Sequence, residues 1–76
     1  MSSLPSVSGM DAIRAFAAHG FELDRVTGSH HILKKDGHAY LLSVPVHGNQ
    51  SLKSGTLRGL IRASGLTVDQ FREALG

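Results

Sequence analysis

The fold of this chain is decided in residues 30–47, which read HHILKKDGHAYLLSVPVH. Asp36-Gly37 within it is a strong signal for a tight turn between two strands. Beyond this turn, apolar residues recur at every second position from Tyr40 to Val46, as they do on one face of a strand. The stretch predicts two antiparallel strands, with Tyr40 half-buried rather than free to stack on a base.

Further signals lie on the N-terminal side of this pair. Apolar residues over 21–26 predict a first strand that ends near the turn at 28–29. Ahead of it, Ser8 and Asp11 form a capping-box pattern before apolar residues at helical spacing, so a helix is predicted over about 9–19.

On the C-terminal side, residues 47–55 form a polar loop that is long for so small a chain, and such loops often carry function. Ser54 is expected to cap a second helix that ends at Gly65. Thr67 and Gln70 form another capping box, which predicts a short third helix. The expected fold class is α+β, with one helix, three consecutive antiparallel strands, one long helix and one short helix.

Length and composition limit the kind of site. With 76 residues, 41% of them apolar, the sequence predicts a flexible segment over 1–8 and a single domain over 9–76, too small for a deep enclosed pocket. The absence of cysteine excludes disulfides, thiolate nucleophiles and cysteine-ligated metals. Without a long apolar run or a signal-peptide pattern, we expect no membrane association and a cytoplasmic location.

Charge is distributed unevenly along the chain. The net charge is +2, but residues 25–62 hold six Lys and Arg residues against one carboxylate, Asp36, a balance of +5. Four of the five histidines also lie there. Lys and Arg supply most sequence-independent affinity for nucleic acids, so a polyanion such as RNA is the favoured partner and a merely solvated basic surface is the alternative. The cations expected to contact RNA are Lys34, Lys35, Lys53, Arg58 and Arg62.

The histidines are the residues best suited to chemistry. His30 and His31 begin a strand, so they point to opposite faces and are judged separately. Histidine can give or take a proton near neutral pH, which suits phosphodiester cleavage, although a single histidine is more often an ordinary surface residue. A metal site would combine one of them with His38 and His47, but no ligand spacing supports it, so no metal is expected.

Four motifs give a resemblance to a known family. They are Gly28-Ser29-His30-His31-Ile32, Val44-Pro45-Val46-His47, Gly55-Thr56-Leu57-Arg58 and Ala63-Ser64-Gly65-Leu66. In order and spacing they resemble the HicA (YcfA-like) family of toxins, and the resemblance covers residues 9–75. Two features depart from the family pattern: residues 37–44 are about two residues longer, and Ser54 replaces the usual Pro or Lys.

The resemblance implies a fold like that of a double-stranded-RNA-binding domain and the activity of a messenger-RNA interferase. Such toxins of type II toxin-antitoxin systems are endoribonucleases that act in the stress response, need no metal or other cofactor, and are neutralised by a HicB-type antitoxin. The histidine of the family's Gly-Ser-x-His motif corresponds to His31, the expected catalytic residue. Ser29, His30 and His47 join the cations as expected RNA contacts. The alternatives are a non-catalytic RNA-binding module of the same fold, which would not need His31, and a pure interaction domain.

Overall fold

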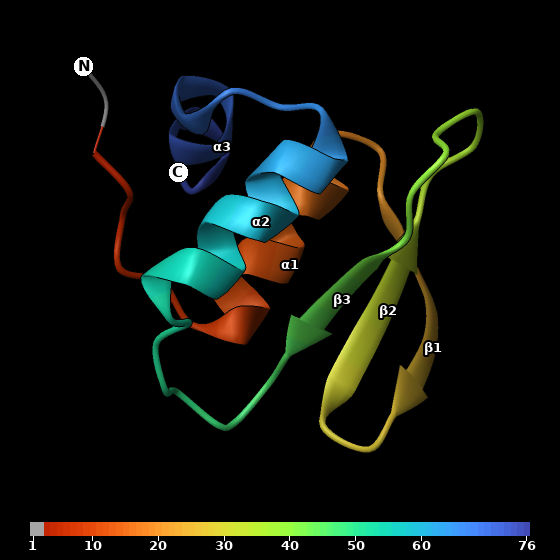
Figure 1. The fold of residues 1–76 in the computed structure, drawn as a ribbon, viewed down its shortest axis with the longest axis horizontal. Coiled ribbons are helices and arrows are strands. Elements are labelled where there is room, and N and C mark those ends of the chain that lie inside the picture. Colours follow the sequence, from red (N-terminus) through yellow and green to blue (C-terminus); the bar gives the residue numbers. More distant parts are fainter. Residues whose placement is uncertain (1–2) are drawn as a thin grey trace.

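A three-stranded antiparallel sheet and three helices make up residues 3–76, the part of the chain that the computed structural model describes (Figure 1). The elements are α1 (Gly9–Ala17), β1 (Glu22–Thr27), β2 (His30–Lys34), β3 (Leu42–Pro45), α2 (Ser54–Ser64) and α3 (Val68–Ala74). This order confirms the predicted α+β class and the layout resembling a double-stranded-RNA-binding domain. No helix in the described part of the chain is long and apolar enough to cross a bilayer.

The strands are joined in chain order, with β2 in the centre of the sheet. On one side β2 pairs with β3, where Leu33 lies opposite Leu42 and His31 lies opposite Val44. On the other side it pairs with β1, whose register shifts between Leu23 and Arg25. Such an irregularity bends an edge strand and weakens its pairing with other chains.

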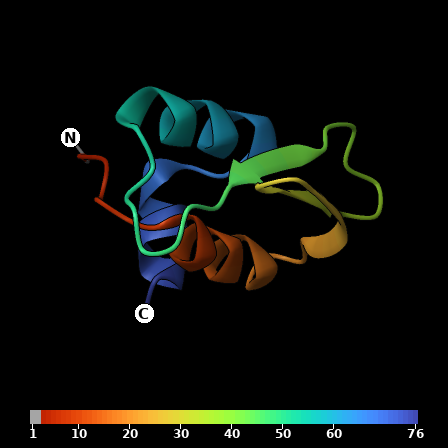
Figure 2. The same cartoon turned by 90° about the horizontal axis from the view of Figure 1, so that it is seen from below.

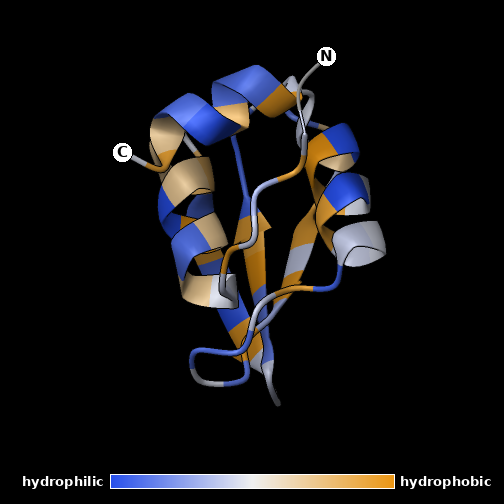
Figure 3. Ribbon diagram, turned by 90° about the vertical axis from the view of Figure 1, so that its left-hand side faces the viewer, coloured by the Kyte–Doolittle hydropathy of each residue, from blue (hydrophilic) through white to orange (hydrophobic). Residues whose placement is uncertain are grey.

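The hydrophobic core lies on one face of the sheet. Three side chains are almost fully buried there, and strand alternation turns all three to this face: Leu33, Leu42 and Val44. β3 points between α1 and α2 and packs against both (Figure 2), and apolar strand segments lie between the two helices (Figure 3). Phe16 of α1 packs on Phe71 of α3 with ring centroids 5.1 Å apart. Every residue of β1 is exposed, because this strand lies farthest from the helices (Figure 1).

Three of the four predicted cap residues are confirmed, whereas α1 ends at Ala17, with Ala18 as its C-cap, rather than at about residue 19. Both capping boxes, at Ser8 and at Thr67, are present, and Gly65 ends α2 with a φ of 79°, in the region that favours glycine. The prediction that Ser54 caps α2 is wrong. Lys53 is the N-cap, because its carbonyl accepts the hydrogen bond of the Leu57 N–H at 3.0 Å, and its side chain makes no capping bond.

The prediction for Tyr40 is also wrong. This side chain is 65% exposed, and β3 begins only at Leu42. The His38 N–H donates to the Lys35 carbonyl at 3.0 Å, and the His38 ring is bonded to the carbonyl of Ala63 at 2.6 Å. These contacts hold the segment before β3 in a loop, so the alternation of a strand does not extend back to Tyr40.

The N-terminal segment, for which the sequence predicts flexibility over 1–8, makes defined contacts from residue 3 onward, while residues 1–2 lie outside the described part. Val7 is 6% exposed, and its carbonyl accepts a hydrogen bond from the Leu52 N–H at 2.8 Å. Arg72 donates to the Ser3 carbonyl at 2.8 Å. The segment therefore contacts both the loop before α2 and helix α3.

Gly9 lies at a close contact of α1 with β3, and Gly59 of α2, which has no such contact, serves as the control. A β-carbon on Gly9 would collide with the carbonyl oxygen of Pro45, whereas one on Gly59 would have nothing within 4 Å. We expect Gly9→Ala to lower the free energy of unfolding by about 1 to 3 kcal/mol through overpacking. Gly59→Ala should raise it by about 0.4 to 1 kcal/mol, because alanine restricts the unfolded chain. Urea unfolding of both variants measures this, and equal effects would contradict the close contact of α1 with β3.

Candidate functional site

His31 lies where the covered face of the sheet meets solvent. It pairs with Val44 on β3 and Val26 on β1, so it shares the face of Leu33 that the helices cover. The ring is partly exposed, but Nδ1 is enclosed and has no hydrogen-bond partner among residues 3–76. Nε2 is not enclosed in this way. A buried polar atom without a partner is unusual and often marks a functional position.

The turn before β2 sets this orientation. Gly28 has a φ of 58°, which a tight turn requires and which side chains rarely adopt. The Ser29 carbonyl then accepts a hydrogen bond from the Val46 N–H at 2.7 Å, which joins the turn to the residue after β3. His31 thus becomes the second residue of β2, while His30 is exposed on the opposite face. The expectation that the two histidines face opposite sides is confirmed.

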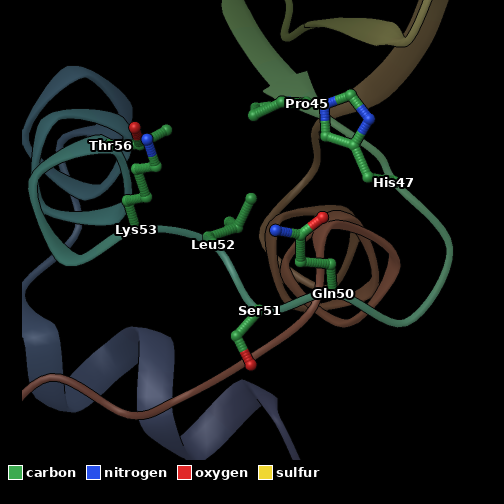
Figure 4. Close-up of a pocket in the computed structure, with 7 residues that line it drawn as sticks. All are labelled: Pro45, His47, Gln50, Ser51, Leu52, Lys53 and Thr56. Carbon is green, nitrogen blue, oxygen red and sulfur yellow. The ribbon is translucent and has the colours of Figure 1, made fainter.

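A pocket of about 240 Å³ lies at the same end of the sheet, between the last residue of β3 and the start of α2 (Figure 4). Pro45 lines the pocket on the side of the sheet. It pairs with His30 and follows Val44, which is the partner of His31. The sequence-predicted residues His47 and Lys53 also line it. The complete lining is Pro45, His47, Gln50, Ser51, Leu52, Lys53 and Thr56.

The start of α2 is suited to an anion. Lys53 makes no side-chain capping bond, and the first turn contains no acidic residue. The first N–H groups of a helix have no partner within the helix, and they carry the positive end of its dipole. A phosphate could be held here by these groups together with the Lys53 ammonium.

The structure brings together only some of the predicted site residues. Five of them lie at the end of the sheet formed by the β1–β2 turn and the loop after β3: Ser29, His30, His31, His47 and Lys53.

The other predicted contacts lie away from this end. Lys34 is three residues along β2 from His31, about 10 Å at strand spacing, and its ammonium lies 3.6 Å from Asp24. Lys35 lies over the ring of Phe21, 5.5 Å from its centroid. Arg58 and Arg62 follow the exposed side of α2, where both line a separate shallow depression.

His38 has a structural role. Its ring bonds to the Ala63 carbonyl and lies edge-on to Phe21, with centroids 5.2 Å apart. It therefore fastens the β2–β3 loop to the C-terminal end of α2. Within residues 3–76 no three His, Asp or Glu side chains are placed to hold a metal ion.

Sequence reasoning missed Gln50 and Thr56 as parts of the site. The polarity and length of the loop 47–55 marked the right segment. The local pattern does not show which of its side chains turn towards Pro45, because both ends of the loop are held by hydrogen bonds from distant residues, Val7 and Ser29.

The comparisons with known proteins agree with the resemblance. The family model described as the HicA toxin of bacterial toxin-antitoxin systems matches residues 9–66, more than half of the chain. A comparison with curated proteins finds no match. The matched range holds His31 and the whole pocket, and it ends before α3.

The contrast between His38 and His47 is testable by stability. We expect His38→Ala to lower the free energy of unfolding by about 1 to 3 kcal/mol, because it removes a hydrogen bond and an aromatic contact. His47 is exposed and its ring makes no hydrogen bond within residues 3–76, so His47→Ala should stay within about 0.5 kcal/mol of the unchanged protein. Thermal and urea unfolding measure both. A His38→Ala variant as stable as His47→Ala would contradict the fastening role.

Proposed function

This chain belongs to the HicA toxin family of bacterial toxin-antitoxin systems, and on that premise we propose that it is a metal-independent endoribonuclease that cleaves messenger RNA through His31. One observation supports the proposal: His31 lies in the sheet with a partly exposed ring whose Nδ1 is enclosed without a hydrogen-bond partner, while Nε2 is not enclosed in this way. A ring oriented in this way by its strand is prepared for proton transfer at one defined nitrogen.

The reaction needs no nucleophile from the protein. The 2′-hydroxyl oxygen of the RNA attacks the adjacent phosphorus, a 2′-O–P bond forms, and the P–O5′ bond breaks. A base takes the proton of the 2′-hydroxyl, and an acid gives a proton to the leaving 5′-oxygen. His31 performs one of these two transfers.

A second group is required for the other transfer. His30 and His47 are the candidates near the site, but His30 projects from the opposite face of the sheet to His31. His47 lines the pocket beside Lys53. The arrangement favours His47 as the second proton-transfer group.

Cations would stabilise the negative charge that develops on the phosphate. Lys53 and the open N-terminus of α2 lie at the end of the sheet that carries His31. Lys34, Lys35, Arg58 and Arg62 lie farther away and would hold the flanking RNA by its phosphates.

An antitoxin partner follows from the family, and we propose that a HicB-type antitoxin covers the face of His31. Leu23 and Val26 of β1 support this location, because they pair with Leu33 and His31 and so lie on that same face. They are 53% and 51% exposed. Exposed apolar residues beside a polar site are typical of protein interfaces.

The catalytic proposal is tested by cleavage of a long unstructured RNA in the presence of EDTA. We expect His31→Ala to lower the cleavage rate at least about a hundredfold, the usual contribution of a general acid or base. His30→Ala is the matched control and should keep most of the activity, because its ring is on the opposite face.

RNA binding is measured on the same variants at several salt concentrations. Binding by His31→Ala that persists and weakens steeply with salt would show that the phosphate contacts remain. Binding by the unchanged protein without cleavage would favour the non-catalytic RNA-binding module. If the unchanged protein binds no RNA at any salt concentration, the remaining interpretation is a domain that interacts only with other proteins.

The antitoxin proposal is tested by introducing a carboxylate at an exposed apolar residue at each end of the sheet. Val26→Glu should weaken binding of a HicB-type antitoxin from the same genome at least about tenfold, because a charge would be buried in the interface. Leu41→Glu is the control, since Leu41 is similarly exposed, at 54%, but precedes β3 at the far end. Calorimetric titration measures both affinities, and equal effects would place the antitoxin elsewhere.

A further inference from the structure

The pocket between β3 and α2 combines apolar walls with polar groups of several kinds. Pro45 and Leu52 supply the apolar walls, and His47, Gln50, Lys53 and Thr56 supply the polar groups. The side-chain amide of Gln50 extends between Leu52 and His47 towards Pro45 (Figure 4). A small number of polar groups on apolar walls is typical of a site that orients a ligand.

The polar side chains of this pocket are not used by the fold. Among residues 3–76, none of the side chains of His47, Gln50, Lys53 and Thr56 takes part in a hydrogen bond or ion pair. Ser51 differs, since its hydroxyl is bonded to that of Ser6 at 3.1 Å and points away from the pocket (Figure 4). The unused groups are therefore concentrated where a ligand could reach them.

The backbone of the pocket is held in place before any ligand binds. The Val46 N–H is bonded to the Ser29 carbonyl at one end of the loop, and the Leu52 N–H to the Val7 carbonyl at the other end. Between them, the Gln50 N–H donates to the His47 carbonyl at 3.0 Å. Such a loop loses little conformational freedom when it binds.

We infer that this pocket binds one unstacked base of the RNA and that Gln50 reads the edge of that base. The inference rests on the proposed ribonuclease function, whose substrate it specifies. The volume of about 240 Å³ is smaller than the roughly 300 to 1,000 Å³ of pockets for drug-sized ligands. It suits a single ring system, and Pro45 and Leu52 would contact the faces of the ring.

The chemistry of Gln50 matches a base edge. Its amide presents a donor and an acceptor side by side, the pattern with which Asn and Gln recognise adenine. Proteins read RNA sequence mostly from unpaired bases that are splayed out of the stack. Lys53 at the rim would hold the phosphate attached to the same nucleotide.

The pocket lies at the end of the sheet that carries His31. It begins at Pro45, which is the cross-strand partner of His30 and follows Val44, the partner of His31. A base held there would fix the register of the strand across His31. The enzyme would therefore show a base preference at one fixed position near the cut and little preference elsewhere.

The test maps cleavage sites on a long unstructured RNA for the unchanged protein, Gln50→Leu, Gln50→Glu and the control Asn49→Ala. We expect the unchanged protein and Asn49→Ala to prefer one base about tenfold at one position, as a paired base edge allows. Gln50→Leu should lose this preference. Gln50→Glu should shift it towards guanine, whose Watson–Crick edge presents two adjacent N–H donors to a carboxylate.

Two results would separate the inference from the proposed function. Cleavage without any base preference, or with a preference that survives Gln50→Leu, would overturn the base pocket and leave the ribonuclease intact. If no protein cleaves RNA, the proposed function fails, and NMR titration with the four nucleoside 3′-monophosphates still tests the pocket. Shifts of the amide signals of residues 50–53 that depend on the base and vanish in Gln50→Leu support it, whereas equal or absent shifts overturn it.

Discussion

The pairing register of β2 and β3 places the core and His31 together. Leu33 opposite Leu42 and His31 opposite Val44 put three apolar residues and one histidine on the face that the helices cover. A slip of one residue would turn His30 and Lys34 towards the helices and His31 away from them. Burying a lysine there without a partner would be costly, so the core strongly opposes the slip. The orientation of His31 is thus enforced by the same packing that stabilises the domain.

The small size of the helical layer explains why the site is open. The helices cover β3 and part of β2, and β1 is left exposed along its whole length. His31 lies at the border of the covered area, which is why one ring nitrogen is enclosed and the other is not. A domain of this size buries too little surface to surround a ligand completely. A polymer that lies across the border and places only one phosphate at His31 fits this geometry better than a small metabolite does.

Local sequence signals predicted the parts of the structure that depend on neighbouring residues. The capping boxes at Ser8 and Thr67, the end of α2 at Gly65 and the opposite faces of His30 and His31 each follow from a few adjacent positions. Tyr40 and Gln50 could not be placed in this way. Their loops are held by bonds between His38 and Ala63 and between Val7 and Leu52, which lie far apart in the sequence. The catalytic position of His31 and the RNA contacts stay predictions.

Under the proposed function, the cations of residues 25–62 would have two different roles, which depend on where the fold places them. Lys34 contacts Asp24, Lys35 lies over Phe21, and Arg62 lines a depression beside α2, so none of the three is placed in the pocket beside Pro45. Their fields nevertheless extend over about a Debye length, close to 8 Å at physiological salt, and would attract a polyanion such as the proposed RNA substrate. Lys53 and the N–H groups at the start of α2 would act at short range, where a fixed hydrogen-bond donor stabilises developing charge far more than a distant cation does. Segment charge in the sequence therefore favours a polyanionic partner, and only the fold separates the cations that would attract the proposed RNA substrate from those that would take part in its cleavage.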